Sequence, residues 1–213
     1  MKITEATLKV SRTASYSINT PDKPISTVVF VIHGYAQLSR DFISEFSFLE
    51  DGSTLIIAPE GLSRFYSKNK IGASWMTKEQ REHEISDYVN YLDKLEAELS
   101  TKNELADAGR FVLGFSQGVH TAVRWFTESE YDHSGLILCS SDFPADADFR
   151  KLITRLGNGK IKYIQGKSDD ITGIRTFEKS SALLESNSVP FTKIFFDGKH
   201  EIDPDSVIEA LKK

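Results

Sequence analysis

The chain has 213 residues, of which 39% are hydrophobic and 27% charged, and its formal net charge is -5. This length suits one α/β domain with a sizeable core, so we expect a single domain over residues 1–213. The acidic balance and the lack of a dense Lys/Arg cluster argue against nucleic-acid binding. No apolar run reaches the length of a membrane span, and the N-terminus lacks a signal-peptide core. A single cysteine, Cys139, fits a reducing compartment and predicts a cytoplasmic protein.

Short apolar runs bounded by Gly, Pro and Asp predict the strands of this domain. Residues 3–10 and 13–18 alternate weakly and predict a two-stranded antiparallel start. The later runs are continuously apolar, as expected for strands buried on both faces. The predicted strands cover residues 3–10, 13–18, 28–32, 54–58, 111–113, 135–140, 160–165 and 191–196.

Apolar positions spaced by three and four residues predict the helices. Residues 62–76, which precede the longest helix, are predicted to form a polar, aromatic loop. Strands that alternate with helices indicate a mostly parallel, doubly wound sheet with helices on both faces. Functional loops are then expected at the carboxyl ends of the strands. The predicted helices begin at Ser39, cover residues 77–99, 119–126, 147–156 and 173–187, and begin again at Pro204.

The strongest functional motif is G-F-S-Q-G at residues 114–118. It stands between the apolar run at 111–113 and a helical pattern at 119–126, and this context is typical of a nucleophile elbow. The tight turn of an elbow strains the backbone of the nucleophile. The helix that follows directs its first N–H groups at developing negative charge. Ser116 is therefore the predicted nucleophile.

A serine hydroxyl needs a base that removes its proton, and in the hydrolase fold this histidine follows the acid along the chain. The chain has five histidines, of which His200 alone fits that order, in a loop directly after the last predicted strand. His83 lies in an E-H-E run without a second His four residues on, so we predict a solvated helix face and no metal site.

The acid of the triad remains open among three aspartates that lie between Ser116 and His200. Asp142 follows an earlier strand, and Asp169 and Asp170 follow a later one. Gly166 lets the chain turn toward the site and favours the later loop. We rank Asp169 first, Asp170 second and Asp142 last.

An oxyanion hole requires two backbone N–H groups. One belongs to the residue after the nucleophile, Gln117, and the other to the loop after an earlier strand, where Tyr35 follows His33 and Gly34. His33 is then a structural residue of the turn, hydrogen-bonded under the loop. This chemistry needs neither a metal nor an organic cofactor.

Six motifs occur in an order that resembles the phospholipase/carboxylesterase family of α/β-hydrolases, which includes acyl-protein thioesterases and small bacterial carboxylesterases. The resemblance implies the α/β-hydrolase fold, a triad of Ser116, Asp169 and His200, and oxyanion donors at Tyr35 and Gln117. The motifs are H-G at 33–34, P-E-G at 59–61, S-W at 74–75, G-F-S-Q-G at 114–118, G-x-x-D at 166–169 and G-K-H at 198–200.

The resemblance also places Trp75 in the loop that borders the acyl pocket. Phe65, Tyr66 and Phe143 are further pocket candidates, with a place in the core as the alternative. Val119 replaces the second glycine of the usual G-G, and Tyr35-Ala36-Gln37 replaces a glycine-containing stretch. Both departures are expected to narrow the pocket or to change its acyl preference. No strand-to-helix connection is long enough to hold a separate lid domain.

We therefore expect a serine hydrolase that cleaves carboxylic esters, with thioesters or lysophospholipids as further substrates, through an acyl-enzyme. Its expected partner is a small-molecule ester, with no nucleic acid and no transmembrane segment, and the protein is expected to be a monomer or homodimer. The rivals are a peptidase with the same triad and a non-catalytic small-molecule binding protein with a hydrolase fold. An intact Ser/Asp/His set disfavours the binding protein.

Overall fold

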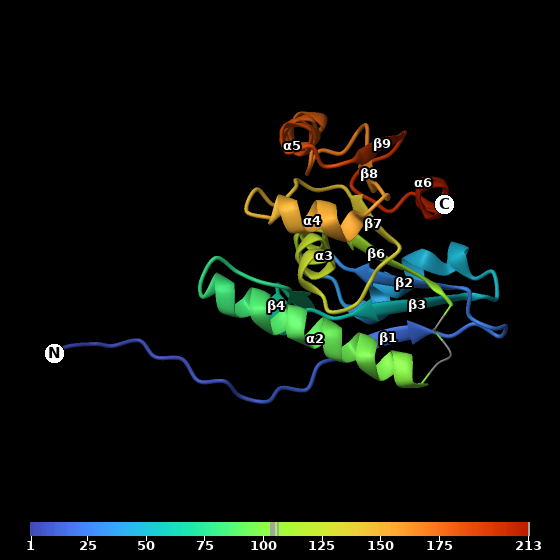
Figure 1. Ribbon diagram of the computed structural model, residues 1–213. Helices are drawn as coiled ribbons and strands as arrows, with labels where there is room; N and C mark the ends of the chain where they lie inside the picture. The colour runs from blue at the N-terminus through green and yellow to red at the C-terminus, as the bar shows by residue number, and fades with distance from the viewer. Residues whose placement is uncertain (103–104, 106, 213) are drawn as a thin grey trace.

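A seven-stranded sheet forms the centre of the computed structural model, which describes residues 1–102, 105 and 107–212 (Figure 1). Its strand order is β1-β3-β2-β6-β7-β8-β9. β1 pairs antiparallel with β3, and the other pairs are parallel, which confirms the predicted doubly wound sheet. The strands are β1 (Tyr16–Asn19), β2 (Thr27–Ile32), β3 (Thr54–Pro59), β6 (Gly109–Phe115), β7 (Gly135–Cys139), β8 (Ile161–Gly166) and β9 (Phe191–Phe196).

Helices cover both faces of this sheet. Because successive strand residues point to opposite faces, β2 supplies Phe30 to one apolar cluster and Val31 to the other. α2, α3, α4 and α5 pack on the first cluster, and α1, η1 and α6 pack on the second. The helices are α1 (Ser39–Phe42), the 3-10 helix η1 (Ile43–Leu49), α2 (Arg81–Lys102), α3 (Gln117–Glu128), α4 (Phe149–Leu156), α5 (Ile174–Ser186) and α6 (Pro204–Leu211).

The antiparallel start predicted at the N-terminus is wrong for residues 3–10. This segment has no strand and extends away from the body, and within 13–18 strand β1 begins only at Tyr16 (Figure 1). Ile3, Leu8 and Val10 are 80%, 86% and 76% exposed. Three widely spaced apolar side chains bury too little surface to offset the entropy lost when a segment is ordered.

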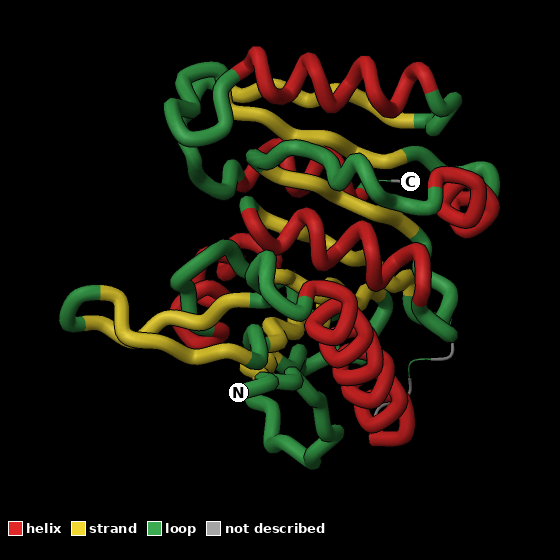
Figure 2. Tube along the Cα trace, turned by 90° about the vertical axis from the view of Figure 1, so that its left-hand side faces the viewer, coloured by secondary structure: helices red, strands yellow, loops and turns green. Residues whose placement is uncertain are grey.

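The loop predicted at residues 62–76 is instead a β-hairpin. Strands β4 (Ser63–Ser67) and β5 (Lys70–Ser74) pair antiparallel, and Tyr66 lies opposite Ile71. Aromatic and β-branched residues favour strands, and Lys68, with φ of 56°, closes the turn. Figure 2 shows the hairpin projecting from the body of the molecule.

Two predicted helices begin or continue differently from expectation. The segment after Ser39 forms only a short α-helix before it tightens into a 3-10 helix, and the backbone leaves helical geometry at Phe46. The N-cap is Leu38 rather than Ser39, because the Ser39 side chain bonds to Glu60 instead. α2 begins at Arg81, later than the predicted Thr77, whose hydroxyl binds Glu84. α6 begins at Pro204 as predicted.

No helix within the described ranges combines the length and the apolar character needed to cross a membrane.

The close approach of α3 to β2 requires glycine at position 118. A Cβ atom there would lie 2.1 Å from the Ile32 carbonyl oxygen and 2.6 Å from the His33 carbonyl oxygen. Both atoms belong to the backbone, so neither can move aside without shifting the strand. We expect Gly118→Ala to lower the free energy of unfolding by about 2 kcal/mol or more, measured by chemical denaturation.

Gly173→Ala is the matched control, because a Cβ atom there would meet the Asp169 carbonyl oxygen at 3.6 Å, which is an ordinary van der Waals contact. This variant should change the free energy of unfolding by less than about 1 kcal/mol. Equal losses in the two variants would contradict the packing argument.

Candidate active site

Ser116 occupies the turn between β6 and α3 in a strained backbone conformation. Its φ is 52° and its ψ is -124°, a combination that a residue with a Cβ atom rarely adopts. The Ser116 amide donates to the Cys139 carbonyl at the end of β7, 3.0 Å away, which anchors the turn at the carboxyl edge of the sheet. The predicted elbow geometry is therefore present, with α3 beginning at the next residue.

His200 and Asp169 meet at the same edge of the sheet. His200 Nδ1 lies 2.9 Å from Asp169 Oδ2, and the imidazole ring lies 4.9 Å from the ring of Phe115, the residue before Ser116. The three side chains come from the carboxyl ends of β6, β8 and β9, where a parallel sheet gathers its loops. Asp169 and His200, which are far apart in sequence, are thus brought into hydrogen-bond contact.

The Asp169 carboxylate is held by several donors besides the imidazole. Oδ1 accepts hydrogen bonds from the amides of Ile171 and Thr172 at 2.9 and 2.7 Å, and Oδ2 accepts one from Gln165 Nε2 at 3.2 Å. Burial raises the pKa of Asp169, but the bonds from Thr172 and His200 outweigh it and hold the pKa below its usual value. The carboxylate is therefore ionised and fixed in direction at neutral pH.

The two alternative acids lie elsewhere. Asp170 is exposed, and Asp142 pairs with His120, whose Nε2 lies 3.0 Å from Asp142 Oδ1. The bond to His120 helps to lower the pKa of Asp142. Of the three aspartates, the structure places Asp169 against His200.

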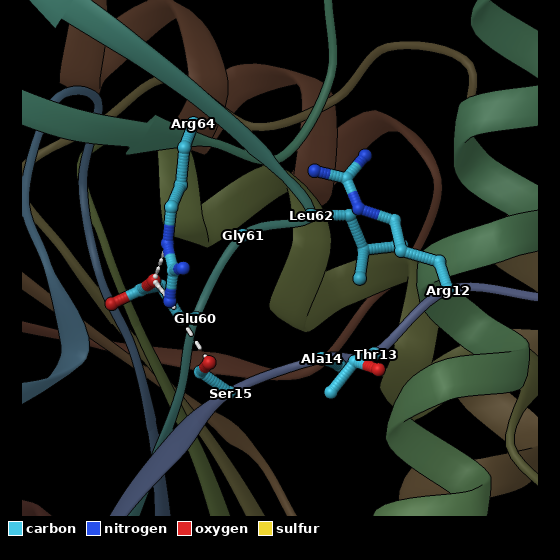
Figure 3. Close-up of a pocket in the computed structure, with 8 residues that line it drawn as sticks. All are labelled: Arg12, Thr13, Ala14, Ser15, Glu60, Gly61, Leu62 and Arg64. Atoms are coloured by element: carbon cyan, nitrogen blue, oxygen red, sulfur yellow. Dashed lines mark hydrogen bonds and ion pairs between the residues drawn. The ribbon is translucent and has the colours of Figure 1, made fainter.

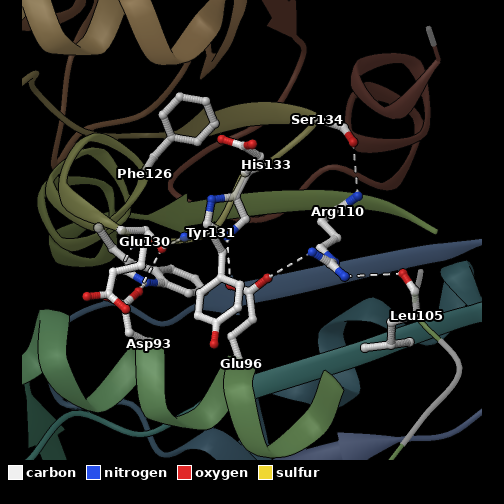
Figure 4. Close-up of polar contacts among 12 residues, drawn as sticks. Asp93, Glu96, Leu105, Arg110, Phe126, Glu130, Tyr131, His133 and Ser134 are labelled. Carbon is white, nitrogen blue, oxygen red and sulfur yellow. Dashed lines mark hydrogen bonds and ion pairs between the residues drawn. The ribbon is translucent and has the colours of Figure 1, made fainter. Parts of the chain in front are cut away.

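His133, which its position along the chain excluded as the base of the triad, belongs to a separate buried cluster (Figure 4). Its Nε2 lies 2.9 Å from Glu96 Oε2, and Arg110 approaches the other oxygen of that carboxylate at 3.8 Å. This cluster ties α2 to the segment before β7.

The loop after β2 packs directly on the nucleophile. A Cβ atom added to Gly34 would lie 3.1 Å from Ser116 Cβ, which is tighter than an ordinary van der Waals contact, so glycine favours this close approach. Beneath the loop, His33 Nδ1 donates to the Gly34 carbonyl at 2.7 Å, and His33 Nε2 accepts from the Gly61 amide at 2.9 Å. These bonds require a neutral ring, and burial lowers the pKa of His33 accordingly. The predicted structural role of His33 is confirmed.

Two backbone amides beside Ser116 are available to a ligand. No described residue accepts a hydrogen bond from the amide of Tyr35 or from that of Gln117. The Gln117 side chain is engaged, since Nε2 donates to Ser74 Oγ at 3.0 Å and to the Met76 carbonyl at 3.1 Å. Two free donors near a serine can stabilise an oxygen that becomes negative.

The four aromatic pocket candidates fall into two groups. Trp75 and Phe143 are 2% and 3% exposed, and Trp75 Nε1 donates to the His33 carbonyl at 2.9 Å. Phe65 lies on the hairpin and stacks on Tyr35 with ring centroids 5.0 Å apart, whereas Tyr66 is 81% exposed. Contact between any of the four and a substrate stays a prediction.

A small pocket lies where the N-terminal segment meets the base of the hairpin (Figure 3). An ion pair of 2.6 Å joins Arg64 to Glu60, and Arg64 also donates to Ser15 Oγ. Burial raises the pKa of Glu60, but the hydrogen bonds from Arg64 and Ser39 outweigh this effect and hold the pKa below its usual value. The lining residues include none of the predicted triad; they are Arg12, Thr13, Ala14, Ser15, Glu60, Gly61, Leu62 and Arg64.

Gln165, which holds Asp169 from the end of β8, was not among the residues predicted from the sequence. Its side chain is fully buried and also donates to the Thr172 carbonyl at 2.7 Å. A glutamine directly after Tyr163 and Ile164 in a buried strand was the available signal, because a buried amide requires hydrogen-bond partners.

A family model described as Phospholipase/Carboxylesterase matches residues 13–213. No curated protein sequence matches the chain at a significant level. Among solved structures, the esterase PE8 is 20% identical with a TM-score of 0.71, covering 92% of this chain and 95% of its own. Acyl-protein thioesterase 2 of Zea mays is 17% identical with a TM-score of 0.69, covering 92% and 96%. The carboxylesterase of Bacillus cereus is 16% identical with a TM-score of 0.65, covering 92% and 91%.

The buried neutral His33 predicts a loss of stability in mild acid. Because its pKa is lowered on folding, the unfolded chain binds this proton more readily. The contribution is complete above the ordinary value of about 6.5 and is lost as the pH falls toward the lowered value. We expect the thermal midpoint to fall between about pH 7 and pH 5, and to fall less steeply in His33→Asn.

His83→Gln is the control, since His83 is exposed on α2 and should leave the pH dependence unchanged. An identical slope in wild type and His33→Asn would refute the assignment to His33.

Proposed function

Because the chain belongs to the phospholipase/carboxylesterase family, we propose that this hydrolase cleaves carboxylic esters through an acyl-enzyme formed on Ser116. His200 acts as general base and Asp169 as the acid of the triad. The single observation that carries the proposal is the hydrogen bond of 2.9 Å between His200 Nδ1 and Asp169 Oδ2, beside a serine in elbow geometry.

The hydrogen bond determines which imidazole nitrogen can act as a base. An ionised carboxylate accepts a hydrogen bond from Nδ1–H, so the proton stays on Nδ1 and the lone pair of Nε2 is left to remove the proton of the Ser116 hydroxyl. Ser116 Oγ then attacks the carbonyl carbon of the ester. The imidazolium formed is stabilised by Asp169 and returns its proton to the leaving alcohol. Water attacks the acyl-enzyme by the same route and releases the carboxylic acid.

The negative oxygen formed in each attack needs donors that are already in place. The amides of Tyr35 and Gln117 support this role, because each is free of described acceptors, Gln117 follows Ser116 directly and Tyr35 follows Gly34, which packs near Ser116. The N-terminus of α3 adds its dipole at the same point. Loss of one such donor typically costs about 10²–10³-fold in turnover.

The substrate range follows from the same chemistry. Oxygen esters and thioesters both present a carbonyl carbon to the serine and a leaving group that accepts one proton. We therefore include thioesters and lysophospholipids among the proposed substrates. Phe65, which stacks on Tyr35 in the loop after β2, is the aromatic candidate that we propose to contact these substrates.

Ser116→Ala should abolish both ester turnover and covalent labelling by a fluorophosphonate, because no other described side chain combines the elbow with an adjacent imidazole. The measurement is mass spectrometry of the labelled protein together with p-nitrophenyl ester hydrolysis. Labelling that persists in Ser116→Ala would overturn the nucleophile assignment.

Asp169→Asn should reduce turnover by about 10⁴-fold, the loss seen for the equivalent change in another triad enzyme. The amide would donate to Nδ1, which would move the imidazole proton to Nε2 and remove the base. Turnover of one ester and the thermal midpoint should be measured together.

Asp170→Asn is the matched control, since Asp170 is the exposed neighbour in the same loop. It should retain turnover within about twofold, as surface substitutions usually do. If Asp170→Asn were the inactive variant, or if neither lost more than about tenfold, Asp169 would not be the acid.

A further inference from the structure

Side chains hold both polar atoms of the peptide bond between His33 and Gly34. Its carbonyl accepts a hydrogen bond from Trp75 Nε1 at 2.9 Å. Its N–H, which belongs to Gly34, donates to Gln37 Oε1 at 2.7 Å. This peptide unit therefore cannot rotate without breaking one of two short bonds. Neither Trp75 nor Gln37 has a part in the proton transfers described above.

The next peptide unit, between Gly34 and Tyr35, is held through its carbonyl oxygen only. The Gly34 carbonyl accepts from His33 Nδ1 at 2.7 Å. Because a trans peptide is planar, the Tyr35 N–H of the same unit points opposite to that carbonyl. The His33 ring thus turns the Tyr35 N–H away from itself. With the Gly34 amide occupied by Gln37, the Tyr35 amide is the donor that this loop leaves free.

Gln37 lies close enough to the nucleophile to control this arrangement. A Cβ atom on Gly34 would be 3.0 Å from Gln37 Oε1 and 3.1 Å from Ser116 Cβ, so both residues pack against Gly34. At its other end, Gln37 Nε2 donates to Glu45 Oε1 at 3.3 Å. The carboxylate of Glu45 can only accept, which directs Oε1 of the amide toward Gly34.

The main chain of the loop is also fixed, because it pairs with strand β5. The Ala36 amide donates to the Ala73 carbonyl at 2.9 Å, and the Ala73 amide donates to the Gln37 carbonyl at 3.2 Å. Ala36 adopts a φ of 63°, where the sequence lacks the glycine expected in this stretch. Gln37 is therefore anchored through its backbone while its side chain holds Gly34.

We propose that Gln37 is a positioning residue, which together with Trp75 fixes the His33–Gly34 peptide so that the Tyr35 N–H faces the developing oxyanion. The inference rests on the proposed function and adds a determinant of its rate. Without the acceptor on Gln37, the Gly34 amide is freed and the peptide can rotate. The Tyr35 donor is then misaligned in the transition state, while binding of the neutral ester is little affected.

Gln37→Met tests this inference, because methionine keeps the length of the side chain and removes the acceptor oxygen. We expect kcat for a p-nitrophenyl ester to fall by about 10–100-fold, with KM within about twofold. Trp75→Phe, which retains a ring and loses the donor, should lower kcat in the same manner. The double variant should lose less than the product of the single losses, since both act on one peptide.

Gln80→Met is the control, because it makes the same substitution at an exposed glutamine and should leave kcat unchanged. Hydrogen exchange gives a readout independent of turnover. In Gln37→Met the Gly34 amide should lose at least about tenfold in protection, whereas the Ala36 amide, bonded to Ala73, should keep its protection.

A kcat within twofold of wild type, or a loss confined to KM, would overturn the inference. So would an unchanged exchange rate of Gly34. If the wild-type protein hydrolysed no ester, the proposed function would fail, and the Gly34 exchange rate would still decide whether Gln37 holds the loop.

Discussion

The packing of α3 against β2 is the constraint on which the site depends. Glycine at position 118 lets the helix touch the backbone of the strand, where a Cβ atom would lie 2.1 Å from the Ile32 carbonyl oxygen. That contact forces the chain between β6 and α3 into a turn too tight for ordinary backbone angles, and Ser116 absorbs the strain. It also brings the loop after β2 onto the nucleophile, where Gly34 meets Ser116. One close contact thus positions both the serine and a candidate oxyanion donor.

The parallel sheet supplies the remaining groups, because all of its carboxyl ends open on one edge. Asp169 and His200 follow neighbouring strands. Two backbone amides bind one oxygen of the Asp169 carboxylate, and the imidazole binds the other. The hydrogen bonds that lower the pKa of Asp169 also fix its direction, so ionisation and orientation have one cause. Across the site, the loop after β2, which carries the candidate oxyanion donor Tyr35, is held by Trp75 after the hairpin and by Gln37 of the loop itself. Both halves of the site are preorganised through contacts with the backbone.

The sequence predicted those features that local pattern determines. Continuous apolar runs gave the strands of the sheet, and the elbow was evident from glycines placed between a strand and a helix. The strand predicted at residues 3–10 was wrong because weak alternation does not reveal whether a partner strand exists. The loop predicted at residues 62–76 was wrong because the polar strands of a hairpin resemble a loop in sequence. Asp169 needed the family resemblance, since spacing alone left Asp170 open. Gln37 and Trp75 could not be predicted, because contacts between side chains and a distant backbone depend on the final packing.

In the proposed reaction, Ser116 attacks an acyl carbon while the amides of Tyr35 and Gln117 hold the oxygen. It is tested most directly by a crystal structure of the protein treated with an alkyl phosphonate ester, whose adduct mimics the tetrahedral intermediate. We expect a phosphonate bonded to Ser116 Oγ, with one oxygen within about 3 Å of both amides. A phosphonate on another residue, or an oxygen turned away from these two amides, would contradict it.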